Sequence, residues 1–483
     1  MARISRCFWL FLALSGVLPV LGCESSTTPA PASSVYQVVT VSDLHFNPFY
    51  DPSLYPSLAA ADASHWAGIF QGSQLQTPAI AGTDTNYPLL TLTLADMKQR
   101  MGASPVVLFT GDLLGHYIPE SFCTAYYAPT NQSPPPNCAL NPDPQVAAAM
   151  QQFIDKTFSF VAAQIRAAVG NAPVIYAPGN IDTYQPTGLG PDATFLMNNA
   201  PTLYSQFLNG SVDQQAFLST FTSDGYYSAQ PLGPGLLVIA LNANSFVLGA
   251  PSSTQAATEI TWLGLQLASA EASGQKVWIL MHVPPGANSQ GMAGATPGQL
   301  EESNVSLNWD PGFQAWFLET LTPHANVVTL MLAGHTHMDE FRLLPSGNVL
   351  EQLPGISPCF GNNPAYKVLT ITQDTFSPTD YVSFDYNLSA TPLPAGFSSL
   401  YQLSSAYNAQ GTLNYALQQL YPQLVSDQSQ QGLYTKYYAS GTAALNPMTH
   451  APWNPITPAN WPIFSCTISQ LDAPDYTTCV NTY

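Results

Sequence analysis

The sequence predicts an α/β protein in which short buried strands alternate with helices. Three observations point to this class: runs rich in β-branched residues recur from residue 35 onward, helix-period segments separate several of them, and polar residues gather where the runs end. Short apolar runs between amphipathic segments are typical of a sheet that helices cover from outside. Such a sheet carries its functional groups beyond the carboxyl ends of its strands.

The expected strands lie at residues 36–43, 105–112, 173–179, 236–242, 276–283 and 327–333, and then at 349–353, 367–372 and 381–386. Helical periodicity covers residues 89–101, 145–169, 260–273 and 313–321. The last strands follow one another without an intervening helix, so we expect part of the sheet to be antiparallel. Residues 121–144 and 185–235 are expected to be long loops or lids, which commonly carry substrate contacts.

The amino-acid composition changes after residue 387. Residues 388–483 are rich in Tyr, Gln and Leu, with helical spacing over 398–421 and then a Pro/Trp-rich stretch that contains two Cys. We therefore expect a main domain at 35–387 and a helical, disulfide-containing extension at 388–483.

The composition excludes several classes of protein. Only 10 of 483 residues are Lys or Arg, 29 are Asp or Glu, and charged residues make up 8%, against about 25% in an ordinary soluble domain. Nucleic acids are held by Lys and Arg, so a formal charge of −19 with so few cations excludes them as partners. Aromatic residues, at 11%, supply enough apolar surface to exclude disorder. The scarcity of charged residues favours a secreted protein.

The N-terminus has the charge order of a signal peptide. Two Arg precede an apolar run at 8–22, which is too short to span a bilayer. The run ends in Val20-Leu21-Gly22-Cys23, which resembles a bacterial lipobox. We expect residues 1–22 to be removed and 23–34 to form a lipidated Cys23 with a polar tether, which would anchor the protein in the bacterial cell envelope. Ordinary signal cleavage beside an incidental Cys23 is the alternative.

Two of the seven Cys lie at or before the expected cleavage site, which leaves five. Cys123 and Cys138 bracket a Pro/Asn-rich loop, and Cys466 and Cys479 bracket the C-terminal tail. Several pairings are open, and these two local ones are favoured. Each bridge would contribute roughly 3 kcal/mol. Cys359 is left over, and we interpret it as a buried small residue in preference to a reactive thiol.

Metal-ligand residues recur at the ends of the expected strands. They are Asp43, His45, Asp112, Asn180, His282, His335 and His337. Such a residue alone is more often structural, but five short clusters, each at a strand end, are not a coincidence. Seven ligands are too many for one tetrahedral zinc ion. They suit two divalent ions about 3.5–4 Å apart that share a carboxylate, and four imidazoles favour Zn²⁺.

The ordered set D-x-H, G-D, G-N-x-D, H and G-H-x-H resembles the calcineurin-like metallophosphoesterase family over residues 35–386. Several strings resemble its acid sphingomyelinase-like phosphodiesterase branch more narrowly. They are SDLHFNPFYDP from Ser42, GDLLGH from Gly111, HVPPG from His282 and NNPAY from Asn362. The resemblance implies a four-layer α-β-β-α sandwich.

The resemblance also implies roles for the ligands. Asp43, His45 and His337 would hold one ion, and Asn180, His282 and His335 the other. Asp112 would bridge both. A hydroxide between the ions would attack phosphorus while the metals neutralise the developing charge.

One position departs from the family pattern. Relatives commonly read Gly-Asn-His, where the His contacts the phosphate and assists the leaving group, but Ile181 follows Asn180 here. His116, four residues after Asp112, is the remaining candidate acid, and a surface loop His is the alternative. Asp182 and Tyr184 are expected to orient ligands without binding metal.

The leading interpretation is a secreted, lipid-anchored, metal-dependent phosphoric diester hydrolase of the sphingomyelinase-like type. Its substrate would be a small-molecule or lipid-headgroup phosphoester. A nucleotide or phosphomonoester phosphatase of the same fold is an alternative. A catalytically idle surface lipoprotein that only binds is another, and Ile181 is its best support. The scarcity of Lys and Arg favours a substrate with a single negative charge.

Overall fold

A computed structural model gives the structure of the chain. It describes residues 34–483 except 103, 131, 209, 251, 442, 443, 446–451 and 454. The expected signal peptide, Cys23 and nearly all of the expected tether lie outside the described residues. Within the described part of the chain, no helix is both long and apolar enough to cross a membrane.

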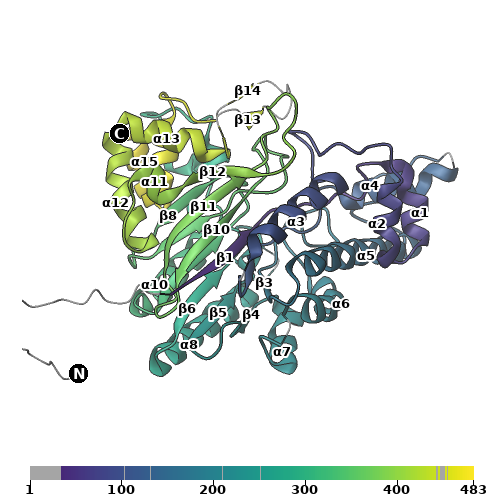
Figure 1. Cartoon of the computed structure of the whole chain (residues 1–483), viewed down its shortest axis with the longest axis horizontal. Coiled ribbons are helices and arrows are strands. Elements are labelled where there is room, and N and C mark those ends of the chain that lie inside the picture. Colours follow the sequence, from purple (N-terminus) through teal and green to yellow (C-terminus); the bar gives the residue numbers. More distant parts are fainter. Residues whose placement is uncertain are drawn as a thin grey trace, which may run out of the picture. The chain divides into compact units, whose positions relative to one another are not determined.

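Two six-stranded mixed sheets form the centre of the structure (Figure 1). The first has the order β12-β11-β10-β1-β2-β3 and the second β4-β5-β6-β7-β9-β8. The strands of the first sheet are β1 Val35–Val41, β2 Val107–Phe109, β3 Val174–Tyr176, β10 Ala365–Thr372, β11 Pro378–Asp385 and β12 Ser398–Gln402. Those of the second are β4 Tyr227–Ala229, β5 Leu236–Ala240, β6 Lys276–Leu280, β7 Val328–Ala333, β8 Glu340–Leu343 and β9 Val349–Gln352.

Each sheet has a parallel part that brings the carboxyl ends of its strands to one edge. Strands β1, β2 and β3 run parallel, and so do β5, β6, β7 and β9. The remaining strands pair antiparallel, as expected for β10 and β11. The prediction of a mixed α/β fold is confirmed.

The second sheet is buried on both faces. Val238, Trp278 and Leu330 belong to the larger core, whereas Ile239 and Ile279 belong to a second core. Successive residues of a strand point to opposite faces, so this alternation places one core on each side of the sheet. The second core contains residues of α8 and α10, which pack against each other.

Acidic side chains cap the N-termini of several helices. Asp143 accepts hydrogen bonds from the backbone N–H groups of Gln145 and Val146 at the start of α5. The helices are α1 Tyr55–Ala60, α2 Trp66–Gln71, α3 Tyr87–Met101, α4 Ile118–Tyr127, α5 Pro144–Val169, α6 Ala193–Leu203, α7 Gln214–Asp224 and α8 Ser253–Ser273. They continue with α9 Ser289–Met292, α10 Pro311–Leu321, α11 Leu403–Tyr407, α12 Leu413–Ser426, α13 Gln428–Tyr438, α14 Trp461–Ser469 and α15 Ala473–Thr482.

Two expectations about loops were wrong. Residues 185–235 contain α6, α7 and β4, and α4 covers the start of 121–144. Asp192 and Asp213 cap α6 and α7, so the chain carries helix-start signals at both places. Residues 398–402, expected to be helical, form β12, which pairs with β11 at the edge of the first sheet. The first sheet therefore continues into the segment that was expected to form the extension, which is otherwise mainly helical.

Candidate metal centre

The seven expected ligands lie just beyond the carboxyl ends of five strands. Asp43 follows β1, Asp112 follows β2 and Asn180 follows β3 in the first sheet. His282 follows β6 and His335 follows β7 in the second. The two sheets thus bring residues from five distant segments to one place.

The backbone at these positions is unusual. Five of the seven ligands have positive φ angles between 43° and 77°. They are Asp43, His45, Asp112, His335 and His337. Residues other than Gly and Asn seldom adopt this region, and such strain concentrates at functional sites. Gly179 is required nearby, because a Cβ there would lie 2.0 Å from Oδ1 of Asp112.

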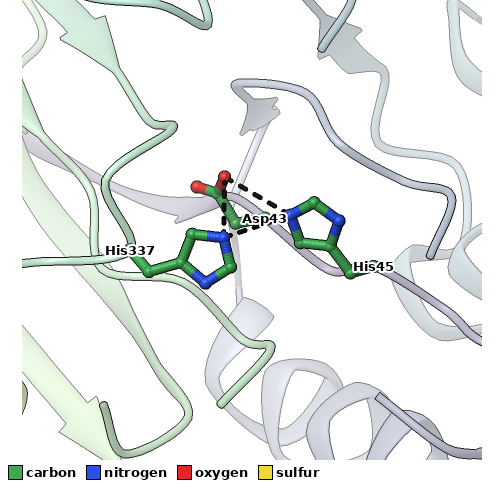
Figure 2. Close-up of side chains that lie close together, drawn as sticks. All are labelled: Asp43, His45 and His337. Carbon is green, nitrogen blue, oxygen red and sulfur yellow. Dashed lines mark hydrogen bonds and ion pairs between the residues drawn. The ribbon is translucent and has the colours of Figure 1, made fainter. Parts of the chain in front are cut away.

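Asp43, His45 and His337 form the first half of the centre (Figure 2). Nε2 of His337 lies 3.4 Å and Nε2 of His45 3.7 Å from Oδ1 of Asp43. The two Nε2 atoms face each other at 3.1 Å. All three side chains are buried.

Asn180, His282 and His335 form the second half. Oδ1 of Asn180 lies 2.9 Å from Nε2 of His282 and 3.0 Å from Nδ1 of His335. Oδ2 of Asp112 lies 3.0 Å from Nε2 of His282 and 3.3 Å from Nε2 of His45. One carboxylate oxygen therefore lies between the two halves.

The second ring nitrogen of three of these His residues is held by the backbone. In each case Nδ1 lies within 3.0 Å of a carbonyl oxygen, which requires a proton on Nδ1. The Nε2 atoms of His45 and His337 then face each other, an arrangement that a cation between them would satisfy. The carbonyls belong to Leu114 for His45, Thr110 for His282 and Ser357 for His337. The donor set fits a pair of divalent cations.

The charges of the centre support the same assignment. Burial opposes the ionisation of Asp43, yet the neighbouring His337 and His45 lower its pKa to about 2. Burial also opposes the ionisation of Asp112, yet His282 and His45 hold its pKa well below its usual range. Burial, aided by His282, lowers the pKa of His335 to about 4. Asp43, Asp112 and His335 are therefore in the deprotonated forms that bind metal. Although burial opposes it, Asp112 raises the pKa of His282 to about 9, and Cys359 and Asp43 raise that of His337 to about 9, so a bound cation would displace these protons.

His116 lies against this centre. Its ring stacks on that of His45 with centroids 4.1 Å apart. Asp84 accepts hydrogen bonds from the backbone N–H of His116 at 2.6 Å and from Nδ1 at 2.9 Å. Although burial opposes the charge, this carboxylate raises the pKa of His116 to about 11. His116 is thus an oriented imidazole beside the centre, and it also shares a hydrogen bond with the thiol of Cys359.

A cavity of about 200 Å³ opens beside His116, and we call it the His116 cavity. Residues 114–120, 181, 183 and 185–188 line it. Ile181, at the position where the family resemblance implies a His, therefore lines the same cavity as His116.

Asp182 and Tyr184, which were both expected to orient ligands, have different hydrogen-bond partners. The carboxylate of Asp182 accepts hydrogen bonds from the backbone N–H groups of Asp112, Leu113, Leu114 and Gly179. It also accepts one from Tyr176, so it holds the loop that carries Asp112. The hydroxyl of Tyr184 instead donates to Asp155 and accepts from Asn198. Tyr184 thus contacts α5 and α6, and none of its hydrogen bonds reaches a ligand.

Sequence reasoning missed Asp84 and the surroundings of Cys359. Asp84 lies in a turn before α3 and carries no sequence signal beyond that of a turn residue. Sγ of Cys359 lies 3.8 Å from Nδ1 of His337. Although burial opposes it, the rings of His337 and His116 lower the pKa of this thiol to about 6. Cys359 is thus half-buried beside the centre and not in the hydrophobic core.

The two expected disulfides are present. Cys123 bonds to Cys138, and Cys466 bonds to Cys479. The first bridge ties α4 to the loop before α5, and the second joins α14 to α15. Cys359 is the free cysteine among the described residues.

No family model matches the chain. It is 23% identical over 476 residues to the human acid sphingomyelinase-like phosphodiesterase 3b, a match that covers 91% of this chain and 89% of that protein. It is 24% identical over 472 residues to the cyclic GMP-AMP phosphodiesterase of Mus musculus, covering 93% and 92%. The match to the sphingomyelinase phosphodiesterase C of Dictyostelium discoideum, 27% over 239 residues, covers 45% of this chain and only 49% of that protein.

Among solved structures, a dimetal phosphatase from Danio rerio is similar with a TM-score of 0.39 and 14% identity, over 76% of this chain and 98% of that one. The curated relatives carry the stronger indication, because two of them match along nearly their whole length. The resemblance seen in the sequence motifs is confirmed: the chain is similar to acid sphingomyelinase-like phosphodiesterases along nearly its whole length.

Proposed function

We propose that the protein is a di-metal phosphoric diester hydrolase that cleaves small-molecule or lipid-headgroup phosphodiesters. The observation that carries the proposal is the position of Asp112. One of its carboxylate oxygens lies between the imidazoles of His45 and His282, which belong to different halves of the centre. Homologues named as phosphodiesterases support the same reaction.

The residues divide into two ligand sets. Asp43, His45 and His337 would hold one cation, Asn180, His282 and His335 the other, and Asp112 both. Two bound divalent cations would activate water and neutralise the charge that develops on the phosphoryl oxygens. Zn²⁺ is the favoured metal, because four of the seven ligands are imidazoles.

His116 would give its proton to the departing alcohol oxygen. Ile181 cannot transfer a proton, so the position after Asn180 contributes no acid here. His116 is held on the same centre by Asp84 and by stacking on His45. A positioned acid typically contributes about 10²–10⁴-fold in rate, most for alcohols that leave poorly.

The substrate would carry one negative charge at the scissile phosphate. The names of the relatives indicate sphingomyelin for one and cyclic GMP-AMP for another. With 10 Lys and Arg in 483 residues, few side chains are available to neutralise additional phosphates. A phosphodiester with a single charged phosphate is therefore favoured over a nucleotide polyphosphate.

The test compares two diesters in the His116→Ala variant, one with an alkyl alcohol and one with nitrophenol as the leaving group. Nitrophenolate departs without a proton, so we expect the alkyl ester to lose about 10²-fold or more and the nitrophenyl ester far less. His65→Ala, an exposed His on a different segment, is the matched control. Equal losses on both esters, with both metals still bound, would contradict the acid role of His116.

We further propose that Cys23 is acylated and anchors the protein in the bacterial cell envelope. The lipobox-like string before Cys23 supports this, and the two disulfides are consistent with a secreted protein. Cys23→Ser should move the protein from the membrane fraction to the soluble fraction while its turnover of phosphodiesters persists. Identical fractionation of variant and wild type would exclude the anchor.

A further inference from the structure

A second cavity of about 460 Å³ adjoins the His116 cavity, and we call it the Asn244 cavity. Its volume is within the range of about 300–1,000 Å³ that small-molecule sites occupy. Gln185 and Thr187 line both cavities, so the two meet at the segment that carries these residues. The lining of the Asn244 cavity consists of residues 185, 187, 189–193, 223, 224, 242, 244, 245, 252, 254, 255 and 258.

The buried part of this lining follows strand β5. Asn242, Asn244 and Ser245 come shortly after the strand and are 2%, 2% and 5% exposed. β5 pairs parallel with β6, and sites in such sheets lie beyond the carboxyl ends of the strands. None of the seven proposed metal ligands comes from this strand end. The metal centre therefore does not explain why polar side chains are buried there.

Asn244 presents an unsatisfied acceptor. Its Nδ2 donates to the carbonyl oxygen of Pro178 at 3.0 Å and to Oδ1 of Asn242 at 2.9 Å, which fixes the orientation of the amide. Its own Oδ1 is buried and has no hydrogen-bond partner in the structure. A buried carbonyl oxygen without a donor is costly, and an O–H or N–H group of a ligand in the cavity would relieve that cost.

The segment between the two cavities passes close to Asn244. A Cβ at Gly190 would lie 2.5 Å from that of Asn244, and Gly190 has a φ of 88°, which favours glycine. The backbone N–H of Gly190 donates to the carbonyl oxygen of Asn180 at 3.0 Å. Gly190 therefore joins the wall of the Asn244 cavity to the loop that supplies an expected metal ligand.

The lining is rich in neutral polar groups. Ten of the sixteen lining residues carry an amide or a hydroxyl group, and none of these sixteen is Lys, Arg, His or aromatic. The carboxylate of Asp192 already accepts the backbone N–H of Phe195 at 2.9 Å, and that of Asp224 accepts the hydroxyl of Ser223 at 2.6 Å. An anion would meet no cation in this lining, and an ammonium group would meet no aromatic face. Amides and hydroxyls are instead suited to exchange hydrogen bonds with the hydroxyls of a ligand.

We propose that the Asn244 cavity holds a neutral, polyhydroxylated substituent of the phosphodiester, the one that remains on phosphorus after cleavage. The inference rests on the proposed function, because it assigns the cavity to one of the two alcohols of the substrate. The His116 cavity would receive the departing alcohol. Hydroxyls of the retained group would donate to Oδ1 of Asn244 and bond to Gln255 at the half-buried edge of the cavity.

The reaction remains an ordinary hydrolysis. The oxygen of water forms a new bond to phosphorus, and the bond from phosphorus to the departing alcohol oxygen breaks. That oxygen gains a proton, and the water loses one. The products are the free alcohol and a phosphomonoester of the polyhydroxylated group.

The test uses 4-nitrophenyl phosphodiesters that differ only in the second alcohol. The alcohols are myo-inositol, cyclohexanol, which is the same ring without the additional hydroxyls, and trans-4-aminocyclohexanol, which adds a positive charge. Nitrophenolate departs from all three esters. The wild type should prefer the inositol ester in kcat/KM by about tenfold or more, mainly through KM. Asn244→Leu and Gln255→Met should each lower this preference roughly three- to tenfold.

Two controls match the substitutions. Asn199 is a 2% exposed Asn on α6, and Gln266 lies on α8 about three turns beyond Gln255. Neither residue lines the Asn244 cavity or the His116 cavity. Asn199→Leu and Gln266→Met should leave the preference as it is. Thermal unfolding and metal content show whether each variant keeps the fold and the centre, and Gln255→Met at its half-buried position carries the test where Asn244→Leu does not fold.

The outcomes separate the inference from the proposed function. Equal kcat/KM for the inositol and cyclohexyl esters, or a preference for the aminocyclohexyl ester, would overturn the inference alone. An inositol preference that Asn244→Leu and Gln255→Met leave unchanged would overturn it as well. Failure to hydrolyse any ester with two metals bound would overturn the proposed function. Calorimetric titration with methyl myo-inositol phosphate would then decide whether the cavity binds a polyhydroxylated group: binding that Gln255→Met weakens would support it, and no binding would overturn it.

Discussion

The Asp182→Asn substitution tests how the chain holds the loop that carries Asp112. In the structure, Oδ1 of Asp182 accepts hydrogen bonds from Leu113 and Leu114 at 2.9 and 3.0 Å. Oδ2 accepts them from Asp112 and Gly179 at 2.9 and 3.0 Å. An Asn side chain keeps one oxygen and presents an NH₂ group to the other pair of N–H donors, so two buried donors lose their acceptor.

The expected loss of stability follows from these two donors. Each buried donor without an acceptor costs about 1–3 kcal/mol, so the free energy of unfolding should fall by about 2–6 kcal/mol. That is a large part of the roughly 5–15 kcal/mol that stabilises an ordinary domain. Asp112 has a φ of 58° and depends on this loop, so we also expect less bound metal and a lower kcat.

The assay is urea unfolding followed by tryptophan fluorescence, with metal content and kcat measured on the same samples. Asp192→Asn is the matched control, because Asp192 caps α6 from a partly exposed position and Asn caps helices equally well. A loss below about 1 kcal/mol in Asp182→Asn, with normal metal content, would refute the idea that this carboxylate holds the loop.

Three further predictions concern protons and metals. Burial raises the pKa of Glu259 to about 8, so the folded protein keeps a proton that the unfolded chain releases above pH about 4.5. The free energy of unfolding should therefore fall as pH rises from about 5 to about 8, and Glu259→Gln should flatten this slope; parallel pH profiles would contradict it. Ile181→His, added to His116→Ala, should restore about tenfold or more of the lost turnover of alkyl esters, and no rescue would mean that the cavity wall cannot present an acid. Asp112→Ala should lower bound metal, measured by elemental analysis, further than His335→Ala does, because Asp112 contacts both halves of the centre; equal losses would argue against a shared ligand.

The ligand set could be predicted because its sequence signal and its geometry have the same origin. Asp43, Asp112 and Asn180 each follow a short buried strand, and parallel strands bring their carboxyl ends to one edge of a sheet. His282 and His335 follow strands of the second sheet, and only the structure shows that the two edges meet. The residue types predicted metal binding, and their positions after the strands predicted where in the fold the metal site lies.

Other features could not be predicted, because they depend on contacts between distant loops. Asp84 bonds to His116 across 32 residues, and neither residue lies in a regular element. The strand β12 was missed because its apolar spacing also fits a helix, and pairing with β11 decides between the two. The role expected for Tyr184 depended on its closeness to Asp182 in sequence, but the two side chains bond to different partners.

Ile181 and His116 are best understood together. Ile181 and His116 line the same cavity of about 200 Å³, and a second His at position 181 would remove apolar surface from it. Ile181 gives this cavity an apolar contact, and His116, which Asp84 holds, is the candidate acid. If the proposed function holds, Ile181 would change which alcohol the site accepts without removing the proton donor. An idle site would need neither an Asp84–His116 pair beside the ligands nor seven intact ligands on a strained backbone. Ile181 therefore supports altered specificity better than it supports lost activity.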